Sequence, residues 1–139
     1  MELMNALPLL HEIQRALERL RVGGETRTIN ILNFPLSEDD SAFLDETLGR
    51  GNLTVNYEGT EHTFWQESKV SGVWWGEYRN SNGKVTMRSI EIAYFPLLAK
   101  AQPEDIDDGI RHLADAIAAQ STQSGQPRRA LPVLSVNGA

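Results

Sequence analysis

The stretch "SGVWWGEYRNSNGK", Ser71 to Lys84, decides the fold because it combines two adjacent tryptophans with a strong turn signal. Asn82-Gly83 is typical of a two-residue type I′ turn between antiparallel strands. Successive residues of a strand point to opposite faces of the sheet, so Trp74 and Trp75 are expected on opposite faces. If one of these rings lies in the core, the other therefore lies outside it.

Two further turn signals, Gly59-Thr60 and Ser71-Gly72, divide the region from Leu53 to Tyr94 into four strands of a meander. Three two-residue turns predict the pairs Val55 with Phe64, Val70 with Val73, Trp75 with Ile90, and Val73 with Ile92. All of these residues fall on one face, which is the expected core face. We therefore predict that Trp75 is the more buried of the two tryptophans and that Trp74 lies outside the core.

The opposite face of this meander collects aromatic and charged side chains. Large rigid rings are enriched in protein interfaces, so the face predicts a partner-binding surface, formed by Trp65, Glu67, Lys69, Trp74, Tyr78, Met87 and Glu91. Cross-strand aromatic pairs also stabilise a sheet wherever they point. An ordinary surface cover, or a sheet covered on both faces, is thus an open alternative.

Helical patterns flank the meander. Apolar residues recur at helical spacing in two segments, which contain Leu9, Leu10, Ile13, Leu17 and Leu20, then Ile106, Ile110, Leu113 and Ile117. Between them a helix is predicted that begins at the N-cap Ser37, has three acids in its first turn and ends at Gly49. A further strand is predicted from Thr26 to Phe34. The expected fold is α+β in two layers, with an antiparallel meander of four to five strands and helices packed on one face.

The composition of the last twenty residues differs from that of the preceding chain. Residues 1–119 are predicted to form one domain, and residues 120–139 a flexible tail. This tail contains the apolar patch Leu131 to Val136, which suggests docking elsewhere or a homo-oligomer.

Charge and composition narrow the function classes. The chain has 139 residues, a net charge of -6 and no cysteine. Acidic charge argues against nucleic acid and anionic lipid as partners, and without cysteine the chain cannot supply thiolate ligands to zinc or an iron–sulfur cluster. No apolar run reaches membrane-spanning length, and the charged N-terminal segment is unlike a signal peptide. We expect a cytoplasmic protein without membrane insertion.

Catalytic patterns are weak. His11, His62 and His112 are far apart in sequence, and Arg15 stands where a zinc helix motif needs its second histidine. No phosphate-binding loop or nucleophilic serine motif is present, and Glu77 is predicted to pair with Arg88 across two strands. We expect neither an enzyme nor a cofactor or metal site.

Three segments resemble the conserved domain of the HupH/HyaF family of hydrogenase expression proteins. They are "ALPLLHEIQRALERL", "FPLSEDDSAFLDETLGRG" and "SKVSGVWWGEYRNSNGKVTMRSIEIAYFPLLAKAQPEDI". The similarity runs from about Ala6 to Leu113, and its most specific element is Gly72-Val73-Trp74-Trp75 followed by "N..G" and "IEI...P". Many members of the family are longer than this chain.

This resemblance implies a function in maturation of membrane-bound uptake [NiFe] hydrogenases. It implies a non-catalytic, chaperone-like protein that binds the hydrogenase small subunit precursor or a HyaE-type maturation protein. The alternative from the residues is a domain that binds and delivers a small molecule or metal in the same pathway, and a self-associating structural subunit is a third possibility.

Overall fold

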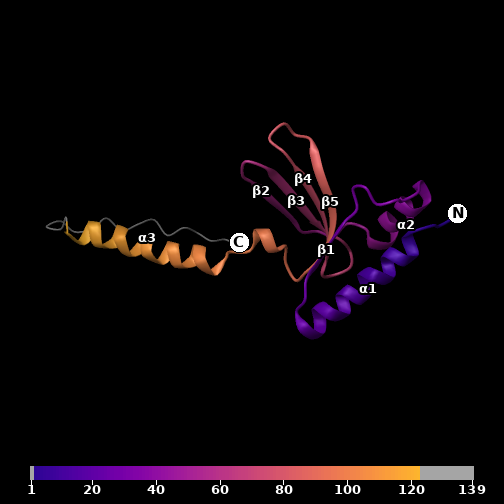
Figure 1. The fold of residues 1–139 in the computed structure, drawn as a ribbon. Helices are drawn as coiled ribbons and strands as arrows, with labels where there is room; N and C mark the ends of the chain where they lie inside the picture. The colour runs from indigo at the N-terminus through magenta and orange to yellow at the C-terminus, as the bar shows by residue number, and fades with distance from the viewer. Residues whose placement is uncertain (1, 123–139) are drawn as a thin grey trace. The chain divides into compact units, whose positions relative to one another are not determined.

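The computed structural model describes residues 2–122, and the chain divides into two compact units, residues 1–100 and 101–139. Unit one contains, in order, α1 (Ala6–Gly23), β1 (Arg27–Asn30), α2 (Glu38–Leu48), β2 (Thr54–Glu58), β3 (His62–Glu67), β4 (Val73–Arg79), β5 (Val85–Ile92) and the short 3₁₀ helix η1 (Leu97–Ala99) (Figure 1). The second unit contains α3 (Pro103–Thr122). The predicted boundary at residue 119 stays a prediction, and the apolar patch Leu131 to Val136 lies outside the described residues.

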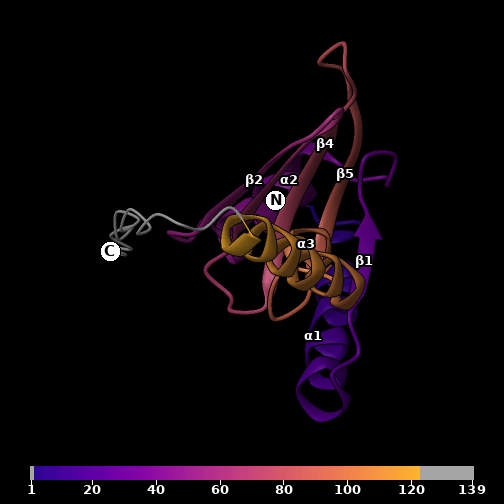
Figure 2. The same ribbon diagram turned by 90° about the vertical axis from the view of Figure 1, so that its left-hand side faces the viewer.

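The five strands form one antiparallel sheet in the order β1-β5-β4-β3-β2. Figures 1 and 2 show α1 and α2 on the same face of this sheet. The predicted α+β fold is confirmed, including the extension of the meander by the strand that follows α1.

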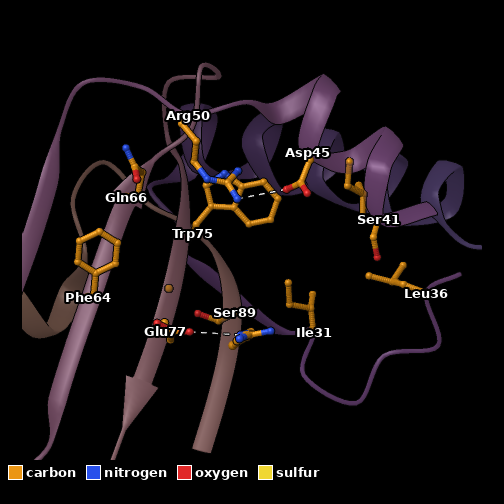
Figure 3. Close-up of a pocket in the computed structure, with 13 residues that line it drawn as sticks. Ile31, Leu36, Ser41, Asp45, Arg50, Phe64, Gln66, Trp75, Glu77 and Ser89 are labelled. Atoms are coloured by element: carbon orange, nitrogen blue, oxygen red, sulfur yellow. Dashed lines mark hydrogen bonds and ion pairs between the residues drawn. The ribbon is translucent and has the colours of Figure 1, made fainter. Parts of the chain in front are cut away.

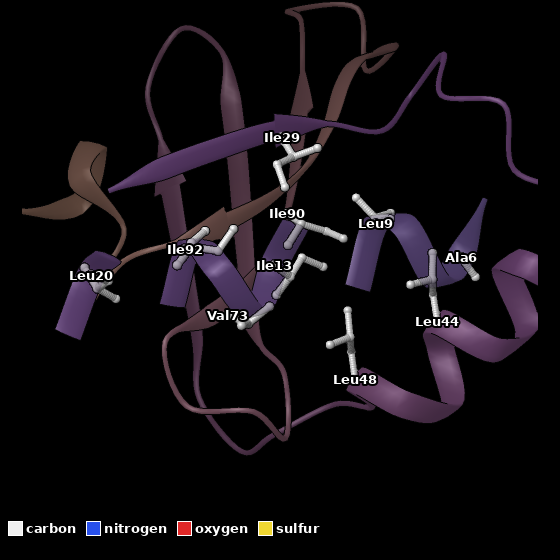
Figure 4. Close-up of a cluster of buried hydrophobic side chains, with 11 residues drawn as sticks. Ala6, Leu9, Ile13, Leu20, Ile29, Leu44, Leu48, Val73, Ile90 and Ile92 are labelled. Atoms are coloured by element: carbon white, nitrogen blue, oxygen red, sulfur yellow. The ribbon is translucent and has the colours of Figure 1, made fainter. Parts of the chain in front are cut away.

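The main core lies between the sheet and these two helices. It consists of one side of α1, two leucines of α2 and four aliphatic residues of the sheet (Figure 4), namely Ala6, Leu9, Ile13, Ala16, Leu20, Leu44, Leu48, Ile29, Val73, Ile90 and Ile92. Trp75 is half-buried and packs against this cluster. Burial of each large aliphatic side chain stabilises the fold by about 1.5–3 kcal/mol. The predicted core face is therefore the face that the helices cover.

The β4–β5 register is as predicted, but its turn is not. Trp75 pairs with Ile90 and Val73 with Ile92. The loop has three residues, with hydrogen bonds from the Asn80 N–H to the Lys84 carbonyl and from the Gly83 N–H to the Asn80 carbonyl. Only Gly83 has positive φ there, at 80°, whereas a type I′ turn needs two such residues. The predicted type I′ turn is wrong, and a bulge at Thr86 compensates for the extra loop residue.

The other two hairpins also have longer loops than predicted. The predicted pair of Val70 with Val73 is wrong: it would set Trp65 opposite Tyr78, whereas Trp65 pairs with Gly76. This shift of two residues leaves the side chains of β3 and β4 on their predicted faces. Val55 pairs with Trp65 rather than with Phe64. That shift of one residue moves Val55 to the face opposite the helices, because side chains alternate along a strand.

The face opposite the helices carries a second, smaller core. Trp65 and Trp74 are 0% and 1% exposed. The Trp74 ring packs edge-on against Phe95, with 5.7 Å between ring centroids, and its Nε1–H donates to the Ala93 carbonyl at 3.0 Å. The chain that follows β5 thus covers Trp74. The predictions that Trp75 is the more buried tryptophan and that Trp74 lies outside the core are both wrong.

A carboxylate completes this second core. Glu91 is 4% exposed, and it accepts hydrogen bonds from the Trp65 Nε1–H at 3.2 Å and from the Leu97 N–H at 3.0 Å. A buried charge is tolerated only where donors satisfy it. Gly76 leaves room for the neighbouring Ser89, because a Cβ on Gly76 would lie 2.5 Å from Ser89 Oγ, whereas its distance of 3.4 Å from Trp65 Cδ1 would be an ordinary contact.

Asp40 joins the N-termini of α1 and α2. It is completely buried, and with Ser37 it forms the capping box of α2. Its carboxylate also accepts the backbone N–H groups of Met4, Asn5 and Ala6 at 2.8, 3.0 and 3.1 Å, which the first turn of an isolated helix would leave unpaired. Burial by itself would raise the pKa of Asp40, but the four backbone donors, led by Ser37, hold this pKa well below its usual range.

We expect Asp40→Asn to lower the melting temperature at neutral pH, because an amide cannot accept four N–H donors. The unfolded state binds the proton more tightly than the folded state, so the contribution of Asp40 is fully present above about pH 5, begins to fall as the pH passes about 3.9, the ordinary value, and continues to fall toward the lower pKa of the folded state. Melting curves from pH 7 to pH 3 check this. If the melting temperature of the variant falls between pH 7 and pH 3 by as much as that of the wild type, the prediction is wrong.

The two tryptophans of β4 give a matched pair of variants. Trp74→Ala is expected to lower the free energy of unfolding by about 3–5 kcal/mol, because it leaves a cavity in a fully buried site. Trp75→Ala should cost less, since that ring is already half-exposed. Urea unfolding of both variants measures the difference, and a larger loss for Trp75→Ala would refute the assignment of the second core.

Candidate functional site

The residues predicted to bind a partner separate into buried and accessible ones. Trp65, Trp74 and Glu91 are buried in the second core, so they cannot touch a partner in this structure. Tyr78 and Met87 are half-buried and pair with each other across β4 and β5. The expected exposed aromatic patch is therefore reduced to this pair, with Trp65 behind it.

Tyr78 links the accessible pair to the buried cluster. Its ring meets the Trp65 ring edge-on, with 6.2 Å between centroids and 81° between planes. Burial and the nearby Glu91 carboxylate raise the pKa of the Tyr78 phenol. The phenol is consequently neutral at physiological pH and serves as an uncharged hydrogen-bonding group at the margin of the face.

Glu67 stays on the predicted face, whereas Lys69 lies outside the strands. Glu67 is half-buried and pairs with Trp74. Lys69 is exposed and belongs to the β3–β4 loop, where its N–H donates to the Leu48 carbonyl at 2.7 Å. A Cβ on Gly49 would lie 2.8 Å from the Lys69 side chain, so this lysine follows the end of α2 and does not flank Trp74. The longer loop explains the error.

A recess of about 410 Å³ opens on the helix-covered face, where α2 leaves part of the sheet uncovered (Figure 3). Its lining mixes apolar and polar side chains from β3, β4, β5, α2 and the segment after β1, among them Ile31, Leu36, Ser41, Phe64, Gln66 and Trp75. Recesses of this size with a few convergent polar groups are typical binding sites. Sequence reasoning missed it, since no single segment contributes more than a few of its residues.

Charged groups in the recess are arranged in pairs. The Arg50 guanidinium lies 4.2 Å from the centre of the Trp75 ring and 3.2 Å from Asp45, as Figure 3 shows. Glu77 pairs with Arg88 at 3.4 Å, which confirms the predicted ion pair. The Trp75 Nε1–H donates to the Gly49 carbonyl at 2.8 Å. The ring is thereby fixed in orientation, with a cation stacked on its face.

The histidines do not form a catalytic or metal-binding cluster in the described part of the chain. His11 is exposed on α1, His112 is exposed on α3, and His62 stands at the start of β3 opposite Glu58 and Arg79. Among residues 2–122, no three His, Cys, Asp or Glu side chains are placed to hold a metal ion. No helix in that range is both long and apolar enough to cross a bilayer.

Comparison with known proteins gives consistent relatives. Residues 3–120 match the family model for the HupH hydrogenase expression protein, C-terminal conserved region. The chain is 32% identical over 114 residues to the hydrogenase expression/formation protein HoxQ of Cupriavidus necator, which covers 82% of this chain and 40% of that protein. It is 28% identical over 113 residues to the hydrogenase-1 operon protein HyaF of Escherichia coli, covering 81% and 39%. The chain thus spans about two fifths of the length of these relatives.

The fold has a solved counterpart in the same family. The hydrogenase expression protein HupH from Thiobacillus denitrificans superposes with a TM-score of 0.72 at 36% sequence identity, covering 83% of this chain and 96% of that one. The match to the family model, over residues 3–120, spans the sheet and its helices. The chain belongs to the HupH family of hydrogenase expression proteins, as a form of its C-terminal conserved region.

Proposed function

We propose that this protein is a non-catalytic, chaperone-like accessory factor in the maturation of [NiFe] uptake hydrogenase. It acts in the cytoplasm and binds the hydrogenase small subunit precursor or another maturation protein of the HyaE type. The family supports the pathway, because its members that match the chain are hydrogenase expression and formation proteins. No nucleic acid, membrane insertion or cofactor enters this proposal.

The recess beside Trp75 is the structural feature that supports the proposed binding function. It offers Phe64 and Trp75 as apolar surface, and its two arginines are each already paired with a carboxylate. Paired charges do not demand a charged ligand, and they supply hydrogen-bonding groups around an apolar floor. Such a surface suits an apolar side chain of a protein segment, in the manner of interface pockets that receive an anchor residue.

The alternative function is binding and delivery of a small molecule or metal. The volume of the recess is compatible with a small organic ligand. No histidine lines it, however, and both arginines in its lining already have a carboxylate partner, Asp45 for Arg50 and Glu77, which Arg79 also contacts, for Arg88. We therefore prefer a protein segment as the occupant.

Filling the recess should block partner capture. Ser41 is exposed at the recess wall on α2, whereas its neighbour Ala42 is exposed but does not line the recess. With the hydrogenase small subunit precursor co-expressed, Ser41→Trp is expected to reduce capture by the tagged chain about tenfold or more, and Ala42→Trp to leave it unchanged. Equal capture by both variants, at unchanged melting temperatures, would remove the recess from the proposal.

Tyr78 and Met87, on the face opposite the helices, allow a test of the partner-binding surface that the sequence predicts. If Tyr78 and Met87 contact the partner together with Glu67 and Lys69, the double variant Tyr78→Ala/Met87→Ala should weaken affinity by about 2 kcal/mol, the hot-spot scale. We compare the affinity of this variant for the isolated precursor, measured by titration, with its melting temperature. Lower stability with full affinity would show that these residues only support the sheet.

A further inference from the structure

The loop between β4 and β5 is held by one side chain. The Asn80 Oδ1 atom accepts the backbone N–H groups of Asn82 at 2.9 Å and of Lys84 at 3.0 Å. The Asn80 carbonyl also accepts the Gly83 N–H at 2.9 Å. An asparagine side chain that accepts the N–H two residues further on stabilises a turn. Three N–H groups of this short loop therefore depend on Asn80.

The side-chain amide of Asn82 lies outside this network. No hydrogen bond joins it to any residue between positions 2 and 122. Gly83 follows it directly, with a φ of 80°, and a Cβ on Gly83 would meet no atom within 4 Å. Because glycine lacks a side chain, its backbone nitrogen can approach the preceding side chain closely. The amide of Asn82 and a nitrogen that can attack it are thus neighbours in the chain.

We propose that Asn82 is a site of non-enzymatic deamidation and that Asn80 sets its rate. The Gly83 backbone nitrogen loses its proton and attacks the Asn82 Cγ atom, so that a C–N bond forms and closes a cyclic imide. The C–N bond of the Asn82 side-chain amide breaks, and its nitrogen leaves as ammonia. Water then opens the imide at either carbonyl carbon. The product is aspartate or isoaspartate, and no oxidant or reductant is needed.

The hydrogen bonds of the loop oppose the first step. Attack needs rotation of the backbone between Asn82 and Gly83, but the N–H groups of both residues are bonded to Asn80. The loop must therefore open locally before the imide forms, and the rate follows the population of the open loop. All of these groups belong to residues 80–84. The reaction thus depends neither on contacts with other parts of the chain nor on the function proposed above.

Isoaspartate changes the backbone of the hairpin. It adds a carbon atom to the main chain between Asn82 and Gly83, in a loop whose ends are joined by the Asn80 N–H and the Lys84 carbonyl at 2.9 Å. Aspartate keeps the original backbone length. Both products add a negative charge to the loop beside the Gly83 carbonyl, to which Arg79 donates at 2.9 Å.

Peptide mapping by mass spectrometry measures the conversion of each asparagine after incubation of the full chain at mildly alkaline pH. A second Asn-Gly pair, Asn137-Gly138, lies outside the described residues and serves as an internal reference in every sample. We expect conversion of Asn82 in the wild type, with isoaspartate in the same peptide. Asn80→Ala removes both bonds to Oδ1 and should raise the rate at Asn82 about tenfold, while the rate at Asn137 stays within a factor of about two.

Asn80→Asp is the matched control, because a carboxylate oxygen also accepts N–H groups. Its rate at Asn82 should stay within a factor of about three of the wild-type rate. Circular dichroism of both variants checks that the sheet is retained. The wild type in urea needs no substitution: there the bonds of the loop are lost, and the rate at Asn82 should rise toward that at Asn137.

Anion exchange separates the converted chains by their added negative charge. The isoaspartate form should melt at a lower temperature than the variant Asn82→Asp, which carries the same charge on an unaltered backbone. Equal melting temperatures would show that the loop accepts the longer backbone, contrary to the proposed dependence on its hydrogen bonds.

Three further outcomes overturn the proposal. If Asn82 stays intact in both the native and the urea-unfolded chain while Asn137 is converted, Asn82 is not a deamidation site. Equal rates at Asn82 in the wild type, in Asn80→Ala and in urea show that the loop does not protect the amide. If Asn80→Asp reacts as fast as Asn80→Ala, the Asn80 oxygen is not the protecting group.

Discussion

The structure of the sheet domain depends on the alternation of side chains along β4. Trp75 points toward the helices and donates its indole N–H to the last turn of α2, at the Gly49 carbonyl. Trp74 points the other way and donates to the Ala93 carbonyl, just after β5. One strand thus fixes the helical layer on one side and the chain that covers the other side. A buried indole N–H needs an acceptor, so both tryptophans select the backbone segments that lie over them.

Two buried carboxylates also join neighbouring elements, here as hydrogen-bond acceptors. Asp40 receives backbone N–H groups from the beginnings of both α1 and α2, which joins the two helices at their N-termini. Glu91 receives the Trp65 indole and the Leu97 N–H, which joins the sheet to η1. Removal of either acceptor would leave buried donors unpaired. Asp40 and Glu91, which are buried as catalytic acids often are, therefore have structural functions.

The accessible features of the first unit lie on both faces of the sheet. The recess beside Trp75 joins three strands to α2 around paired charges, and the Tyr78 and Met87 pair lies on the opposite face. Hydrogenase expression proteins match the chain along most of its length.

The sequence by itself determined the fold class, the strand that follows α1, the helix-covered face and the family, because these depend on local periodicity, turn residues and a motif around Trp74-Trp75. It could not determine loop lengths, and hence placed Lys69 and Val55 wrongly, since one added residue in a hairpin changes the register without changing the apolar pattern. Only the tertiary structure decided that Trp65 and Trp74 are buried. Their cover comes from Phe95 and the chain up to Leu97, and a strand's own sequence carries no signal of what later packs on its outer face. The recess likewise depends on how far α2 extends across the sheet, which packing alone determines.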